Sequence, residues 1–309
     1  MPLHPQSEAF IAAVREADAP AWNEMPLEEA RETFAALPFI GRGPDVDNVK
    51  DELIAGVPTR IYHVNEGQPR DVIVYFHGGG WVLGGIETHD AICRRLADAA
   101  DATVVSVEYR NPPENPFPAA PEDCFTVCDV LALDHASYCV TSRMVVCGDS
   151  AGGNLAVAVS LMARQRGGPA LAGQVLIYPV LDGSMSTKSY QQFGTDHGLT
   201  ADMMRWFWQM YTGDGASSSR HDPRASPSAV EDVSGLPPTY LLVAEYDVLC
   251  DEGRVFADRL LAANVPTTFQ QYDGMLHGFV HCAEWFDDSV AATNDVATHC
   301  RKLLDAERS

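Results

Sequence analysis

The sequence lacks the segments that place a protein in or across a membrane. No uncharged apolar run approaches the roughly 18 residues of a membrane-spanning helix. The opening residues, MPLHPQSEAF, show no basic region followed by an apolar run, so no secretion signal is predicted. We therefore expect a cytoplasmic protein with no membrane partner.

Positive charge is scarce. The 309 residues include 21 lysines and arginines against 43 aspartates and glutamates, which gives a formal net charge of −22. Nucleic acids and anionic lipid surfaces are polyanions, so neither is expected as a partner. The acidic excess favours solubility, and adaptation to a salty medium is a second interpretation that the sequence leaves open.

Cysteine pairs with metal-binding spacing are also missing. The eight cysteines form no CxxC motif. Cys124 and Cys128 lie four residues apart on an expected helix, but no cluster of histidines and cysteines accompanies them. We interpret all eight as buried, reduced thiols. No metal site and no cofactor are predicted.

Apolar segments alternate along the chain in a pattern typical of α/β proteins. The first two expected strands form an antiparallel pair around a turn at Ala55 and Gly56. Helical segments separate the later strands, which predicts a mostly parallel eight-stranded sheet with helices on both faces. Strands are expected at 46–54, 57–64, 71–76, 103–109, 144–148, 174–180, 239–247 and 267–273, and helices at 88–100, 118–136, 151–166, 251–263 and 285–306.

Two segments break this alternation. Residues 5–36 have a helical pattern with Pro20 as a break, and a long stretch without an expected strand contains TADMMRWFWQMY, with Thr200 as its expected N-cap. Connections that long usually have a structure or a function of their own. We predict a helical cap made of residues 1–45 and 182–225, over a catalytic domain made of residues 46–181 and 226–309. A peripheral decoration is the alternative.

The chain contains one Gly-x-Ser-x-Gly pentapeptide, Gly148-Asp149-Ser150-Ala151-Gly152. An expected strand precedes it and an expected helix follows it, which is the context of a nucleophile elbow. The glycines leave space where a Cβ would collide, and the N–H groups at the start of the helix point to the same place. The pattern predicts Ser150 as a nucleophile.

A second glycine-rich motif, His77-Gly78-Gly79-Gly80, follows the third expected strand. Consecutive glycines let backbone N–H groups face a ligand, which suits an oxyanion hole. A phosphate-binding loop is the rival interpretation, but the chain has neither Gly-Lys-Ser/Thr nor Gly-x-Gly-x-x-Gly with a later acid. His77 precedes the serine in the chain, so we interpret it as a brace for this loop.

The acid of a catalytic triad is expected between the serine and the histidine in this kind of fold. Asp247 ends the expected strand 239–247, where a carboxylate would emerge at the carboxyl edge of the sheet. Asp251 and Glu252 are rivals, but a favourable charge in the first turn of the next helix explains both. We therefore predict Asp247 as the acid.

The base is expected near the end of the chain, where YDGMLHGFVHC offers His277 and His281. His277 follows the last expected strand in a loop, and His281 comes one helical turn later. His299 lies within the expected C-terminal helix and is interpreted as a surface residue of that helix. We predict His277 as the base.

Five motifs now stand in order over residues 75–279: HGGGW, EYRNPPENPFPAAPED, GDSAGGNLA, AEYDVLCDEG and HGF. Together they resemble the hormone-sensitive-lipase-like esterases, the bacterial family IV of lipolytic enzymes. The resemblance implies an α/β-hydrolase fold with a helical cap, and it raises a homodimer as an expectation. The chain departs from the usual pattern at Val248, where the family often has proline, and at Asn111 and Pro112, where it often has leucine and alanine.

The resemblance also implies the roles of single residues. It makes Ser150 the nucleophile, Asp247 the acid and His277 the base, and it gives the oxyanion hole to the N–H groups of Gly79, Gly80 and Ala151. The predicted function is a serine carboxylesterase that hydrolyses small esters of short to medium acyl chains through an acyl-enzyme. Apolar candidates for its acyl pocket are Trp81, Trp206, Phe207, Trp208 and Tyr211, with packing between cap and core as the alternative.

Other functions fit the sequence less well. A binding protein that has lost catalysis would be expected to lack a triad member, and all three positions are filled. A serine enzyme with a Ser-x-x-Lys pair is excluded, because none of the three lysines has a serine at that spacing. Amidase, lactonase and acyl-transfer activities stay open, since they share the acyl-enzyme.

Overall fold

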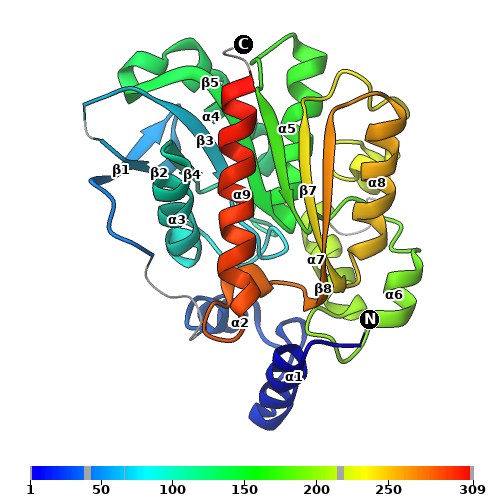
Figure 1. Ribbon diagram of the computed structural model, residues 1–309. Coiled ribbons are helices and arrows are strands. Elements are labelled where there is room, and N and C mark those ends of the chain that lie inside the picture. The colour runs from blue at the N-terminus through cyan, green and yellow to red at the C-terminus, as the bar shows by residue number, and fades with distance from the viewer. Residues whose placement is uncertain (1, 38–42, 66, 214–218, 307–309) are drawn as a thin grey trace.

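A sheet of eight strands, in the order β1-β2-β4-β3-β5-β6-β7-β8, forms the centre of the protein in the computed structural model (Figure 1). The structure describes residues 2–37, 43–65, 67–213 and 219–306. β1 and β2 pair antiparallel, β2 pairs antiparallel with β4, and the remaining pairs are parallel. The strands are β1 (Asn48–Ile54), β2 (Val57–His63), β3 (Arg70–Phe76), β4 (Thr103–Val107), β5 (Val140–Asp149), β6 (Gly173–Ile177), β7 (Thr239–Tyr246) and β8 (Thr267–Leu276). The predicted mostly parallel eight-stranded sheet is confirmed.

Helices cover both faces of this sheet and bury a separate apolar core on each. β3 contributes to both cores, because its side chains alternate: Val72, Val74 and Phe76 face one, and Ile73 and Tyr75 the other. The long helices are α1 (Pro5–Ala17), α2 (Leu27–Ala35), α3 (Asp90–Ala100), α4 (Ala119–Leu133), α5 (Ala151–Arg166), α7 (Ala201–Thr212), α8 (Cys250–Ala262) and α9 (Asp287–Ala306). α3 and α9 lie together on one face, and residues of α4, α5 and α8 fill the core on the other (Figure 1).

The first hairpin forms as the sequence predicts. Ile54 pairs with Val57 across a two-residue turn. Ala55 and Gly56 have φ angles of 50° and 85°, which is the left-handed conformation that such hairpin turns require. The hairpin therefore extends the sheet at the edge away from β8.

The ends of several elements differ from the prediction. β5 begins at Val140, four residues before the predicted start, and β8 continues to Leu276. β6 ends at Ile177 instead of 180, because Tyr178 adopts a φ of 33° and leaves the strand direction. The short helix α6 (Lys188–Phe193) was not predicted, since six residues show no clear helical period.

The two segments predicted to form a cap contain α1 and α2 in one part and α6 and α7 in the other. Thr200 caps α7 as predicted, with its hydroxyl accepting the N–H of Met203 at 3.1 Å. The short helix η1 (Trp22–Glu24) packs against α7, so the two segments touch. Parts of both predicted ranges, residues 1, 38–42 and 214–218, lie outside the described residues. Among the residues that are described, no helix has the length and apolarity needed to cross a bilayer.

Candidate active site

Three strand ends bring the predicted triad together. Ser150 follows β5, Asp247 follows β7 and His277 follows β8, all at the carboxyl edge of the parallel part of the sheet. Neighbouring parallel strands end at the same edge, so residues separated by more than a hundred positions in the chain meet there. Ligands of open α/β sheets bind at this edge.

Ser150 occupies a sharp turn between β5 and α5. Its φ of 54° and ψ of −116° are unusual for a residue with a side chain. A Cβ at Gly152 would overlap the carbonyl group of Phe76, and a Cβ at Gly148 would overlap the backbone of Gly152. The serine N–H donates to the Ile177 carbonyl at 2.8 Å, which holds the turn against β6. The predicted elbow geometry is present, and only glycine fits on either side of it.

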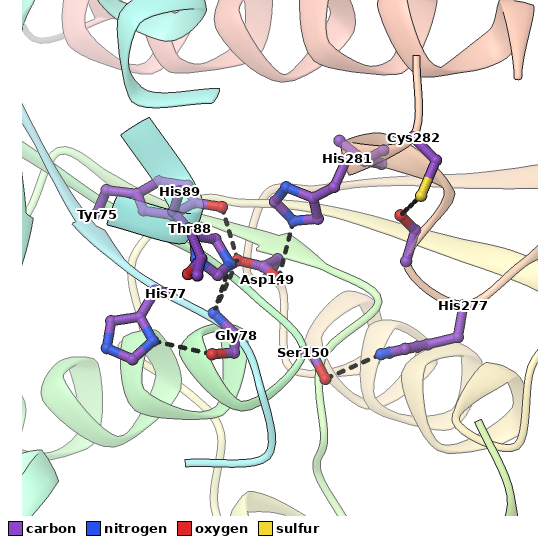
Figure 2. A network of polar contacts seen from close by, with 12 residues as sticks. Tyr75, His77, Gly78, Thr88, His89, Asp149, Ser150, His277, His281 and Cys282 are labelled. Atoms are coloured by element: carbon purple, nitrogen blue, oxygen red, sulfur yellow. Dashed lines mark hydrogen bonds and ion pairs between the residues drawn. The ribbon is translucent and has the colours of Figure 1, made fainter. Parts of the chain in front are cut away.

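The three side chains form a continuous chain of hydrogen bonds. Ser150 Oγ lies 3.0 Å from His277 Nε2, and His277 Nδ1 lies 2.6 Å from Asp247 Oδ2. The other carboxylate oxygen of Asp247 accepts the N–H of Leu249 at 3.0 Å. Asp247 is 1 % exposed and Ser150 is 6 % exposed, so both side chains are buried and the acid is the more enclosed of the two. Figure 2 shows His277 reaching from its own loop to Ser150.

The glycine-rich loop lies beside this serine in a conformation that depends on its glycines. Gly79 and Gly80 have φ angles of 101° and 61°. A Cβ at Gly79 would overlap the backbone of Leu83, and one at Gly80 would overlap the Phe207 ring. Among the described residues, the N–H groups of Gly79, Gly80 and Ala151 have no protein acceptor. Three backbone donors are thus free to bind a ligand oxygen at the site.

His77 is buried next to the glycine-rich loop and contacts its backbone at Gly78. Its side chain is fully buried, its ring stacks on Tyr109 with centroids 4.1 Å apart, and its Nδ1 lies 2.8 Å from the Gly78 carbonyl. Burial lowers the pKa of His77 to about 3, so the ring is neutral at physiological pH. This position agrees with the structural role expected from the sequence.

His281, the second candidate base, faces a different carboxylate. Its Nε2 lies 3.0 Å from Asp149 Oδ2, whereas His277 faces Ser150 (Figure 2). His89, Asp149 and His281 form a group whose donor atoms could hold a metal ion. Asp149 Oδ1 already accepts hydrogen bonds from Tyr75 Oη and the Gly78 N–H, and His89 Nε2 accepts the same N–H. We therefore interpret the group as an internal polar network, in which His281 lies at ion-pair distance from Asp149.

Sequence reasoning missed this network. The sequence held part of the information needed to find it. Asp149 is the variable residue of the elbow motif, so it had to lie next to the serine. Nothing in the sequence indicated that His89, at the start of α3, and Tyr75, on β3, would face that carboxylate.

The remaining rivals of the triad lie elsewhere. Asp251 accepts the N–H of Ser189 at 2.9 Å, and the buried Glu252 accepts the N–H of Leu181 at 2.7 Å. Burial raises the pKa of the Glu252 carboxyl well above its ordinary value. His299 stacks on Tyr240 with ring centroids 3.8 Å apart.

The aromatic residues predicted for the acyl pocket divide into two groups. Trp81, Trp208 and Tyr211 have no exposed surface, and Trp81 stacks on Tyr211 with centroids 4.1 Å apart. These three pack against one another and leave no surface for a substrate in this structure, which corresponds to the packing alternative. Phe207 lies against Gly80 of the glycine-rich loop, and Trp206 is half-buried.

Comparison with known protein families matches residues 73–281 to a family described as having the alpha/beta hydrolase fold. The chain belongs to this α/β-hydrolase family. Carboxylic ester hydrolase LipN of Mycobacterium tuberculosis is 38% identical over 274 residues, covering 85% of this chain and 72% of LipN. The arylesterase of Saccharolobus solfataricus is 33% identical over 289 residues, covering 91% and 93% of the two chains.

Solved structures agree with these relatives. An ester hydrolase from the metagenome of Lake Arreo, complexed with a derivative of bipyridine phosphonate, is similar with a TM-score of 0.93 and 33% identity, over 99% of this chain and 100% of that one. The hyperthermophilic esterase from Pyrobaculum calidifontis gives a TM-score of 0.92 and 35% identity, over 98% and 99%. This α/β hydrolase is thus a carboxylic ester hydrolase of the hormone-sensitive-lipase-like type, as the sequence motifs predicted.

Proposed function

We propose that this α/β hydrolase is a serine carboxylesterase with Ser150 as nucleophile, His277 as base and Asp247 as the acid that orients the base. The observation that carries the proposal is the unbroken chain of hydrogen bonds from Asp247 through His277 to Ser150. Ionised Asp247 accepts the Nδ1–H of His277, which leaves the lone pair of Nε2 directed at the serine hydroxyl.

The reaction follows from this tautomer. As Ser150 Oγ bonds to the ester carbonyl carbon, its proton moves to His277 Nε2, and the C=O electrons move to oxygen. The tetrahedral species collapses to an acyl-enzyme, and the leaving alkoxide takes the proton from His277. Water then attacks the acyl carbon as it gives a proton to the same nitrogen. The second tetrahedral species collapses to the free acid, and Ser150 Oγ takes that proton back from His277.

The free backbone donors support the same chemistry. The N–H groups of Gly79, Gly80 and Ala151 are proposed to bind the oxygen that becomes negative in the tetrahedral species. Donors fixed before the reaction stabilise this charge without reorganising, and each contributes about 10²–10³ in kcat. The left-handed backbone conformation of Gly79 and Gly80, which glycine adopts without strain, supports this assignment.

We further propose that residues 1–45 and 182–225 form a cap that limits the length of the acyl chain. The contact between η1 and α7 and the position of Phe207 against Gly80 support this assignment. Each acyl CH₂ that is buried contributes about 0.8 kcal/mol until the pocket ends. Esters of short to medium chain length are the expected substrates.

The test is a panel of p-nitrophenyl esters from acetate to palmitate, measured on the wild type and on Ser150→Ala. We expect kcat/KM to rise towards butyrate or hexanoate and then to fall. Ser150→Ala should lose activity with the fold retained, and a fluorophosphonate should label Ser150 in the wild type. Labelling of another serine, or full activity in Ser150→Ala, contradicts the assignment.

A further inference from the structure

The carboxylate of Asp149 lies directly beneath the glycine-rich loop. It is 3 % exposed, and its Oδ1 accepts the Gly78 N–H at 3.0 Å and the Tyr75 hydroxyl at 2.7 Å. A Cβ added to Gly78 would overlap this carboxylate. The loop therefore rests on Asp149 with no space between them, and Gly78 immediately precedes Gly79, one of the proposed oxyanion donors.

Two imidazoles surround the same carboxylate. His281 Nε2 lies 3.0 Å from Oδ2, and His89 Nε2 lies 3.4 Å from Oδ1. Burial alone would raise the pKa of the Asp149 carboxyl, but the neighbouring imidazoles of His89 and His281 bring it well below its ordinary value. A buried carboxylate needs such partners, because an unpaired charge in this interior would be costly.

His281 links this carboxylate to the segment that carries the base. It closes the 3₁₀ helix η6 (Phe279–His281), four residues after His277. One carboxylate thus connects three segments: the loop at Gly78, the elbow at Asp149 itself and the turn that follows His277. Figure 2 shows His281 and Gly78 converging on Asp149, while His277 and Ser150 meet below it in this view.

We propose that Asp149 is a positioning residue for the oxyanion hole, and that His281 holds its carboxylate in the orientation that fixes the Gly78 peptide. The inference rests on the proposed serine esterase function. His281 touches no reacting atom, so its effect passes through Asp149 and Gly78 to the direction of the next N–H group. Loss of His281 lets the carboxylate turn, and a misdirected donor weakens binding of the oxyanion more than binding of the neutral ester.

The first variants are His281→Leu and His281→Gln. Leucine removes the partner of Asp149 Oδ2, whereas the glutamine amide can still donate a hydrogen bond to it. The control is His299→Gln, because His299 is also packed on an aromatic ring but belongs to α9 and contacts Tyr240 and Asp295. Activity is expressed per active site, counted by titration with a fluorophosphonate, so that unfolded protein does not enter kcat.

We expect His281→Leu to lower kcat about 10- to 100-fold, less than the loss of a whole oxyanion donor, with KM changed by no more than about twofold. The inhibition constant of a trifluoromethyl ketone, which forms a tetrahedral adduct with the serine, should rise by the same factor as kcat/KM falls. His281→Gln should recover most of the loss. His299→Gln should stay within about twofold of the wild type.

Two outcomes overturn the proposal. One is a normal kcat per active site in His281→Leu with fewer active sites, which is the sign of a stability role alone. The other is a fall in kcat without any change in ketone affinity. If His281→Leu does not fold, Tyr75→Phe removes another donor to Asp149 and should shift kcat and ketone affinity in parallel, and unchanged values there contradict the proposal. An inactive wild type that no fluorophosphonate labels would instead refute the proposed esterase function.

Discussion

Two imidazole–carboxylate pairs lie close to Ser150 in this protein. His277 pairs with Asp247 at 2.6 Å, and His281, four residues later, pairs with Asp149 at 3.0 Å. The free nitrogen of His277 faces Ser150 Oγ, whereas the Asp149 carboxylate of the second pair faces Tyr75 and Gly78. The same two functional groups therefore have different surroundings. One pair meets the serine hydroxyl, and the other meets the Tyr75 hydroxyl and the Gly78 N–H.

The local backbone creates this difference. Leu276 ends β8, so His277 stands in the loop above the sheet edge, where the elbow presents its serine. His281 lies at the end of η6, and its ring meets His89 edge-on with centroids 4.8 Å apart. One turn of 3₁₀ helix is enough to separate a histidine that faces the serine hydroxyl from one that faces Asp149.

The largest effect is expected when the imidazole of His277, the proposed base, is removed. His277→Gln should lower kcat by about 10⁴- to 10⁶-fold, because triad members act as a unit. The matched change at the second pair, His281→Gln, should keep kcat within about one order of magnitude of the wild type, since glutamine can still donate to Asp149. Steady-state kinetics on p-nitrophenyl butyrate separates the two, and equal losses would erase the distinction between the pairs.

The next largest effect is expected at the oxyanion donors, which the His281–Asp149 pair is proposed to position. Replacing the amide N–H of Gly79 or Gly80 by an ester oxygen should lower kcat about 10²- to 10³-fold, because it deletes one oxyanion donor and keeps every side chain. Gly84, whose φ is 79°, offers the same replacement in a glycine of the same loop region as a control. Unchanged kcat at both Gly79 and Gly80 would place the oxyanion hole elsewhere.

His77 is a third imidazole near this site. Its Nε2 is buried without a hydrogen-bond partner among the described residues. Burial lowers the pKa of His77 to about 3 from its ordinary 6.5. Between these values the unfolded chain binds a proton that the folded protein does not, so stability falls as the pH falls below 6.5. The expected contribution is about 1.4 kcal/mol per pH unit.

Urea unfolding of the wild type and of His77→Gln between pH 7 and pH 5 measures this contribution. The free energy of unfolding of the variant should depend less steeply on pH. Equal slopes for the two proteins would mean that His77 is protonated in the folded state.

The smallest effect is expected from Phe207 in the proposed cap, and it concerns the preference for acyl-chain length. Phe207→Ala should raise the ratio of kcat/KM for C10 over C4 esters by about 4- to 15-fold, because one or two further CH₂ groups gain room at about 0.8 kcal/mol each. Tyr211→Phe keeps the stack on Trp81 and should leave the ratio unchanged. A constant ratio in Phe207→Ala would assign chain-length selection to other residues.

Much of this protein could be predicted from local sequence patterns. The strand–elbow–helix run around Ser150, the turn at Ala55 and Gly56 and the N-cap at Thr200 all depend on residues close together in the chain. The boundaries of β5, β6 and β8 could not be predicted in the same way, because the pairing strand, and not local propensity, decides where a strand ends. The order of acid and histidine after the serine followed from the fold, so Asp247 and His277 could be chosen before their distances were known.

The sequence by itself determined the fold class, the elbow and a choice between two histidines. Only the tertiary structure decided which carboxylate each histidine would meet, since Asp149 ends β5 directly before Ser150, whereas Asp247 follows β7, two strands away in the sheet. It also decided that Trp81, Trp208 and Tyr211 pack together while Phe207 meets Gly80. Side-chain direction depends on how an element is rotated against its neighbours, and one helix read alone does not contain that rotation.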